Sequence, residues 1–189
     1  MNNLSLWAQA VLKMNNLTFC VIDTCSVEKD ADMIALLTLN REGIIDSAAY
    51  IHPGRTPGVY NTDYTGLTES MMSAASPDLA SVWDTLQEIL SGKYVLSYNF
   101  AFVRRVLSEN AEHYHLARFA LIGECLQQTA LLYFRSKGYP GVHLSLATAC
   151  KLIGYALPER PDAFERAVAQ FALLHAIASE QALQYEHPF

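Results

Sequence analysis

The sequence predicts an α/β fold in which one mixed sheet of five strands carries helices on both faces. Residues 17–22, LTFCVI, form an apolar, β-branched run that is typical of a buried strand. Two further strand patterns follow directly, and two short ones then alternate with helical patterns, which is the order expected for a mixed sheet. The chain has 189 residues, of which 51% are hydrophobic. That is enough apolar material for one such domain.

The first half of the chain predicts three strands and then two helices. We expect the strands over residues 17–22, 33–39 and 44–51. A hairpin-type turn over 40–43 joins the second strand to the third, and the sequence PGRTPG at 53–58 is a loop. Thr68 caps a short helix that ends at Met72, and Ser76-Pro77 begins a longer helix that runs to about Leu90.

The second half of the chain alternates strands and helices. We expect strands over residues 94–97 and 119–122, and helices over residues 101–108, 125–134, 145–153 and 162–183. The strand over residues 94–97 is short and expected to be buried. This alternation favours helices on both faces of the sheet.

The N-terminal segment carries a short repeat, because MNNL at residues 1–4 recurs at residues 14–17. Between the copies, apolar residues fall at helical spacing: Leu4, Trp7, Ala8, Val11 and Leu12. We therefore expect a helical extension over residues 1–16 ahead of a domain over residues 17–189. The helix packs on its own domain or, alternatively, on a second copy of the chain in a homodimer.

The net charge, the apolar runs and the cysteines argue against several classes of protein. The net charge is −6, with −7 in residues 1–92 and +1 in residues 93–189. Such an acidic chain lacks the basic footprint of a non-specific nucleic-acid binder, although a protein that engages only a strand end does not need one. No apolar run is long enough to span a membrane, no secretory signal is recognisable, and the four cysteines form no CxxC pair. We expect a cytoplasmic protein with reduced thiols.

Asp23 is a carboxylate at the end of the first predicted strand. An unpaired charge is costly to bury, so Asp23 either caps the loop that follows or belongs to a functional site.

Five segments, taken in order, resemble the DEDD (DnaQ-like) family of 3′→5′ exonucleases, which have the ribonuclease-H-like fold. VIDT at 21–24 resembles the first motif, D-T-E, and TGLTESM at 65–71 resembles the segment T-G-I-T-x-x-M. YNFAFV at 98–103 resembles the second motif, H-N-x-x-F-D, and SLATACKLIG at 145–154 is similar to the helix before the third motif. ERAVAQ at 165–170 resembles the third motif, H-x-A-x-x-D. The resemblance covers residues 17–182 and implies this fold.

The resemblance also places the catalytic positions, and most of them are substituted. In the family, four carboxylates bind two divalent ions and a third-motif histidine is the general base. Here only Asp23 keeps its carboxylate, since the other acid positions fall on Cys25, Val103 and Gln170, and the base position falls on Glu165. A thiol, a hydrocarbon and a neutral amide do not balance two hard dications. We therefore expect no bound metal, although the side chains at the four acid positions should still converge on one pocket.

The resemblance implies nucleic-acid contacts at a second set of residues: Thr24, Thr65, Asn99, Phe102 and Arg104. The pair Arg104-Arg105 either approaches a phosphate or is simply solvated. Three acidic residues after Asp23, namely Glu28, Asp30 and Asp32, are interpreted as a solvated charge run.

Three functions remain open at this point. The sequence favours a degenerate 3′→5′ exonuclease-like protein, a pseudoenzyme without a cofactor, that binds a single-stranded nucleic-acid end or a protein partner. The first alternative is an active exonuclease with an atypical Mg²⁺ or Mn²⁺ site. The second is a scaffold or dimerisation protein that binds no nucleic acid.

Overall fold

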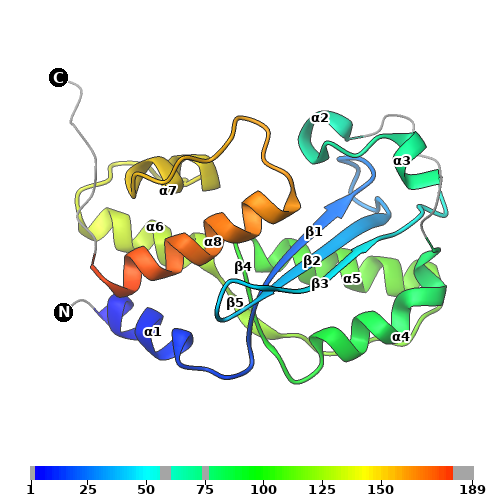
Figure 1. Cartoon of the computed structure of the whole chain (residues 1–189), viewed down its shortest axis with the longest axis horizontal. Coiled ribbons are helices and arrows are strands. Elements are labelled where there is room, and N and C mark those ends of the chain that lie inside the picture. The colour runs from blue at the N-terminus through cyan, green and yellow to red at the C-terminus, as the bar shows by residue number, and fades with distance from the viewer. Residues whose placement is uncertain (1–2, 56–60, 74–76, 181–189) are drawn as a thin grey trace.

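A twisted five-stranded sheet forms the centre of the molecule (Figure 1). The computed structural model describes residues 3–55, 61–73 and 77–180. The strands are β1 (Leu17–Thr24), β2 (Met33–Asn40), β3 (Ile45–Tyr50), β4 (Tyr94–Ser97) and β5 (Ile122–Cys125). Their order is β3-β2-β1-β4-β5. β2 pairs antiparallel with β1 and β3, and β4 pairs parallel with β1 and β5, so the mixed sheet predicted from the sequence is confirmed.

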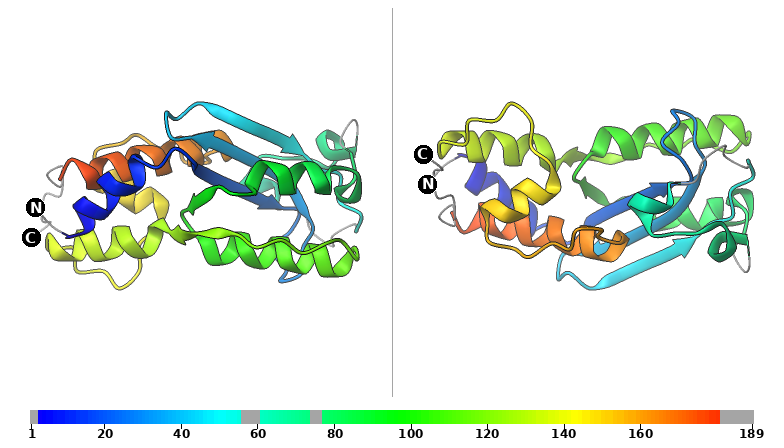
Figure 2. Two further views of the ribbon diagram at one scale, coloured as in Figure 1. Left: turned by 90° about the horizontal axis from the view of Figure 1, so that it is seen from below. Right: turned by 90° about the horizontal axis from the view of Figure 1, so that it is seen from above.

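Helices cover both faces of this sheet (Figure 2). They are α1 (Asn3–Leu12), α2 (Thr62–Thr65), α3 (Glu69–Ser73), α4 (Leu79–Leu90), α5 (Phe100–His113), α6 (Leu126–Ser136), α7 (Leu146–Leu152) and α8 (Ala163–Ala178). One apolar cluster packs α1, α6, α7 and α8 on one face, and a second packs α4 and α5 on the other.

Strand β1 is buried along its whole length because both of its faces meet a helical layer. Leu17, Phe19 and Val21 pack with α8, whereas Cys20 and Ile22 pack with α4 and α5. Side chains alternate between the two faces of a strand. Asp23 continues the first set, so its carboxylate faces α8.

Several elements differ from the expected boundaries by a few residues, and packing explains the differences at β5 and α5. β5 begins at Ile122 rather than at residue 119, because parallel pairing with β4 starts where Ile122 lies opposite Tyr94. The preceding Phe119 and Leu121 pack instead against the α4–α5 cluster. α5 runs to His113, five residues further than expected. Its last turns are fixed by the buried Asn110, whose side chain accepts a hydrogen bond from the Met33 backbone N–H at 3.0 Å.

The N-terminal helix α1 packs on the same domain, as one of the two sequence-based alternatives stated. Ala8 and Val11 are buried, and Trp7 packs partly buried against the α8 cluster. The Gln9 side chain donates to the carbonyl of Ala178 at the end of α8, at 2.8 Å. The expected end of the last helix at residue 183 lies outside the described residues, and within them α8 ends at Ala178.

A helix that crosses a bilayer must be about 20 residues long and largely apolar. None of the described helices is both long enough and apolar enough to cross a membrane.

Candidate functional site

A cavity of about 490 Å³ lies at the carboxyl ends of the parallel strands β1 and β4. The ends of these strands contribute Asp23, Thr24 and Ser97 to its wall. The first turn of α5 adds Asn99 and Phe102, whose positions are fixed because the Asn99 side chain caps the helix by accepting from the Phe102 N–H at 3.1 Å. Tyr64 of α2 and Arg166 and Gln170 of α8 also line the cavity.

The structure brings together six of the ten predicted site residues. These are Asp23, Val103 and Gln170 from the acid positions, and Thr24, Asn99 and Phe102 from the expected nucleic-acid contacts. Cys25, Glu165, Thr65 and Arg104 do not line this cavity. Gln170 lines the same cavity as Asp23, as expected for the register in which ERAVAQ is aligned with the third motif.

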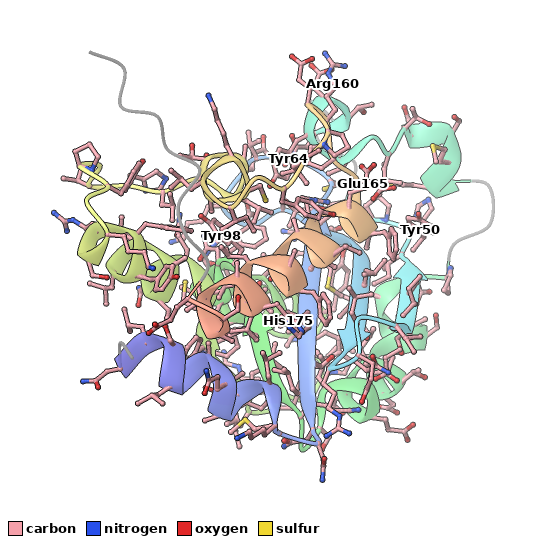
Figure 3. All side chains as sticks on the ribbon, turned by 60° about the vertical axis from the view of Figure 1, so that its left-hand side comes forward. Tyr50, Tyr64, Tyr98, Arg160, Glu165 and His175 are labelled. Atoms are coloured by element: carbon pink, nitrogen blue, oxygen red, sulfur yellow. The ribbon has the colours of Figure 1, made fainter. Side chains whose placement is uncertain are left out.

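An arginine that the sequence interpretation did not single out is bound to Asp23. Arg166 Nη2 donates to Asp23 Oδ2 at 2.6 Å, and the two side chains are only 7% and 2% exposed. Arg166 Nε donates to the carbonyl of Asp162 at 3.1 Å, and the guanidinium carbon lies 4.9 Å from the ring centroid of Tyr64. Figure 3 shows Tyr64 beside the N-terminal end of α8. The guanidinium is therefore held from three sides.

Burial and pairing act in opposite directions on Arg166. Burial lowers the pKa of its guanidinium, but the hydrogen bond and the charge of Asp23, together with Tyr64, raise that pKa, and the net shift is upward. Arg166 thus stays charged at any physiological pH. The site contains a permanent cation supplied by the chain itself.

The donor set at this site does not fit the two divalent ions that the resemblance implies. Asp23 Oδ2 is occupied by Arg166, and the Gln170 amide oxygen accepts the Tyr98 backbone N–H at 2.7 Å. Val103 carries no ligating atom. Across residues 3–55, 61–73 and 77–180, no three His, Cys, Asp or Glu side chains are grouped so that they could hold a metal. The positive charge of Arg166 would also repel a divalent cation in this cavity.

The second carboxylate oxygen of Asp23 is not bound by Arg166. Oδ1 is buried and has no hydrogen-bond partner among the described residues. A buried acceptor without a donor is costly, so the site has one acceptor that is available to a ligand donor.

Cys25 does not converge on the cavity with the other three acid positions, contrary to the expectation from the sequence. The pairing of β1 with β2 becomes irregular between Asp23 and Thr24, and such an irregularity re-aims the side chains that follow. Cys25 is buried in a separate apolar cluster with residues such as Leu67 and Met72. Burial raises the pKa of its thiol, so it is not a thiolate ligand at neutral pH.

Glu165 and Thr65 have structural roles next to the cavity. Glu165 accepts the Asp162 backbone N–H at 2.9 Å while Asp162 caps the Glu165 N–H at 2.8 Å, which is a capping box at the start of α8. Thr65 Oγ1 donates to the carbonyl of Asn61 at 3.0 Å. This bond fixes the turn of α2, which places Asn61 and Tyr64 in the cavity wall.

The acidic run after Asp23 is only partly solvated. Asp32 is buried, and its carboxylate binds the Arg55 side chain and accepts the Tyr114 hydroxyl at 2.6 Å. The interpretation of Asp32 as a solvated residue is therefore wrong, because two partners compensate its burial. Asp30 is exposed, and Glu28 lines the rim of the cavity.

Comparisons with known proteins identify the fold. No family model matches the sequence, and no curated protein matches it. Among solved structures, the chain is similar to the nuclease domain of 3′hExo, a DEDDh family member bound to rAMP, with 15% identity over 94% of this chain and 99% of that chain and a TM-score of 0.64. It is similar to exonuclease X in complex with 5′ overhanging duplex DNA, with 15% identity over 87% and 92% and a TM-score of 0.58.

A third similar structure is the zinc-bound form of the Escherichia coli ExoI–ssDNA complex. Identity is 17% over 87% of this chain and 41% of that chain, and the TM-score is 0.70. Identities this low establish the shared fold and nothing finer. The chain has the ribonuclease-H-like fold of the DEDD exonucleases, as the motif order predicts.

Proposed function

We propose that this protein binds the end of a single-stranded nucleic acid without hydrolysing it. The observation that carries the proposal is the Arg166 guanidinium seated on Asp23, at the position where the related fold would need metal ligands. A guanidinium offers several N–H donors in a fixed plane, which suits phosphate oxygens, so the chain supplies its own cation for that role. Binding is therefore independent of divalent metals.

Aromatic side chains in the cavity wall support a nucleic-acid ligand. Tyr64, Tyr98 and Phe102 line the cavity, and Arg105 lies 5.4 Å above the Phe102 ring. Bases stack on such rings with little sequence preference, and each stacked base contributes about 1–3 kcal/mol. The similar structures described above include complexes with DNA and with a nucleotide.

The orphan oxygen of Asp23 supports recognition of a strand end. Asp23 Oδ1 needs a donor, and a terminal sugar hydroxyl is a donor that an internal DNA phosphodiester lacks. The absence of hydrolysis follows from the same geometry. Glu165 is engaged in the α8 capping box, so the general-base position of the related fold places no base in the cavity.

The proposal is tested by fluorescence anisotropy with single-stranded oligonucleotides in the presence of a chelator. We expect saturable binding of a 3′-hydroxyl oligonucleotide and weaker binding of the same oligonucleotide carrying a 3′-phosphate. Phe102→Ala should weaken binding of both, whereas Leu132→Ala, at an exposed apolar side chain of α6 outside the cavity, should not. Equal binding of both oligonucleotides, or none without added metal, would contradict the proposal. The second result would favour the active-exonuclease or protein-partner alternatives.

A further inference from the structure

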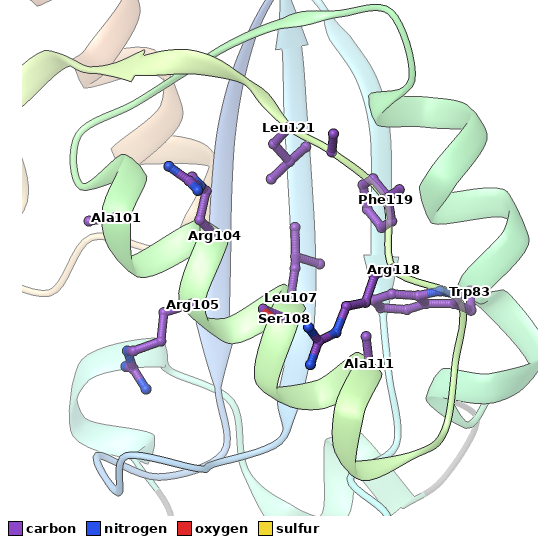
Figure 4. Close-up of a pocket in the computed structure, with 11 residues that line it drawn as sticks. Trp83, Ala101, Arg104, Arg105, Leu107, Ser108, Ala111, Arg118, Phe119 and Leu121 are labelled. Carbon is purple, nitrogen blue, oxygen red and sulfur yellow. The ribbon is translucent and has the colours of Figure 1, made fainter.

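A second cavity, of about 500 Å³, lies between α4, α5 and the chain segment that leads into β5 (Figure 4). Three arginines line it: Arg104 and Arg105 from α5, and Arg118 from the segment before β5. As Figure 4 shows, the Arg118 side chain extends towards Ser108 on α5. Among the described residues, no acidic side chain lines this cavity. It is a cationic surface on a chain whose net charge is −6.

The cations of this cavity are only weakly compensated. Arg105 pairs with Glu109 at 2.7 Å and Arg118 pairs with Glu112 at 2.8 Å, and all four side chains are at least 29% exposed. Ion pairs this exposed are worth little, because water competes for both partners. Arg104 is exposed and makes no ion pair within the described part of the chain. The N–H donors of Arg104 and Arg118 are thus available to an anionic ligand, whereas Arg105 also donates to the carbonyl of Lys29.

Arg105 connects the two cavities. It lines both of them, and its guanidinium lies above Phe102, which belongs to the first cavity. Along α5, Asn99, Phe102 and Val103 face the first cavity, while Ala101, Arg104 and Ser108 face the second. A chain-like anion that ends in the first cavity therefore reaches the second by crossing a single helix.

The floor of the second cavity is apolar and fixed. Trp83 is buried, its indole N–H donates to the carbonyl of Ala117 at 2.8 Å, and its ring contacts Phe119 edge-on at 5.5 Å. These contacts hold the segment that carries Arg118. The cavity thus combines an apolar floor, against which sugars or bases can pack, with cationic walls that can bind phosphates.

We propose that this second cavity binds the phosphodiester backbone of the same single strand whose end lies in the first cavity. The proposal rests on the proposed function for where the strand ends. Its occupant is a polyanion with a regular charge spacing and apolar faces, namely single-stranded nucleic acid. Arg105 lines both cavities, which favours a ligand that occupies both. An acidic peptide lacks the bases and the terminal sugar hydroxyl that the first cavity is proposed to bind.

Oligonucleotides of increasing length, from a dinucleotide to a dodecamer, test this proposal in chelator-containing buffer. For the unmodified protein we expect affinity to rise with length beyond the dinucleotide. The double variant Arg104→Ala/Arg118→Ala should lose that rise and keep the affinity for the dinucleotide. The slope of log affinity against log salt for the dodecamer should decrease by about 1.4, because two phosphate contacts at about 0.7 each are lost. Both residues are exposed, so thermal unfolding of the variant should match that of the unmodified protein.

The control variant Arg135→Ala/Lys151→Ala removes the same charge from exposed positions outside both cavities and should keep the length dependence. A rise with length that survives in Arg104→Ala/Arg118→Ala would overturn the inference and leave the proposed function intact. Dodecamer binding that needs these arginines, without any dinucleotide binding, would overturn the proposed function but support a polyanion site in the second cavity. Polyglutamate binding through the same arginines, with no oligonucleotide binding, would overturn the inference in favour of an acidic peptide.

Discussion

The guanidinium of Arg166 and the carboxylate of Asp23 form a buried ion pair at 2.6 Å between residues 143 positions apart in the sequence. The pair joins the first turns of α8 to the carboxyl end of β1. It places a fixed positive charge where a resemblance to two-metal nucleases leads one to expect bound cations. The consequences for stability, metal binding and chemistry are separately measurable.

Removing one partner of this ion pair should lower the free energy of unfolding far more than replacing both partners. Arg166→Ala leaves the Asp23 charge buried and unpaired, so we expect a loss of about 3–5 kcal/mol in the free energy of unfolding. The double variant Asp23→Leu/Arg166→Met replaces the pair by apolar side chains and should lose less than Arg166→Ala. Urea unfolding measures all of these values. Arg160→Ala, at an exposed arginine whose contact with Asp63 is 3.7 Å, is the control and should change stability little. A loss in the double variant as large as that in Arg166→Ala would contradict this expectation.

Arg166 should also decide whether the site responds to divalent metal. Its charge repels a dication and occupies Asp23 Oδ2, so millimolar Mn²⁺ should not raise the unfolding temperature of the unmodified protein. Arg166→Ala frees the carboxylate, and Mn²⁺ should then stabilise the variant by about 1 kcal/mol at several times the Kd. Thermal unfolding with and without chelator measures the difference. Equal stabilisation of both proteins would mean that Mn²⁺ binds elsewhere or beside Arg166.

Gln170 should act as a structural acceptor for the Tyr98 N–H. Gln170→Leu leaves that partly buried backbone donor without its partner, which should cost about 1 kcal/mol of unfolding free energy. Gln170→Glu retains an acceptor oxygen at the same position and should be less destabilising than Gln170→Leu. The comparison uses urea unfolding, with Gln128→Leu on the exposed side of α6 as the control. A Gln170→Leu protein as stable as the control would contradict this role.

Alkaline pH should weaken the hydrogen bond that Tyr114 donates to Asp32. Burial and the hydrogen bond to Asp32 raise the pKa of the Tyr114 phenol to about 12, from an ordinary value of 10.0. The stabilisation is complete below pH 10 and is lost as the pH rises through 12, because the unfolded state releases the phenol proton first. Tyr114→Phe should be less stable than the unmodified protein at pH 8 by about 1 kcal/mol, and this difference should shrink between pH 10 and 12. A constant difference over that range would contradict the assignment.

The fold could be predicted from the sequence because its signals are local and mutually consistent. The strand patterns, the order of the five segments and the spacing from Asp23 to Gln170 all indicate the same sheet, and the structure places both residues at one cavity. Local patterns were weaker where tertiary packing decides the outcome. The apolar residues Phe119 and Leu121 resemble a strand, but they pack against helices instead of pairing with β4.

The site itself was less predictable, for identifiable physical reasons. Arg166 occupies a variable position of the third motif, and an arginine in a helix is ordinarily interpreted as solvated. The sequence indicates its role only indirectly. Arg166 immediately follows the general-base position of the third motif, in which the acid is replaced. The irregular pairing at the end of β1, which turns Cys25 away, and the partners that bury Asp32 arise only from contacts distant in sequence.

The most direct test of the central claim is a gel assay of a 5′-labelled single-stranded oligonucleotide incubated with the unmodified protein and Mn²⁺. Under the proposed function Arg166 takes the place of the metals, and the side chain at the general-base position, Glu165, does not line the cavity. We therefore predict that the oligonucleotide stays at full length even when it is saturated with protein. A ladder of products shortened from the 3′ end, abolished by chelator and by Asp23→Ala, would contradict the account and establish an active nuclease.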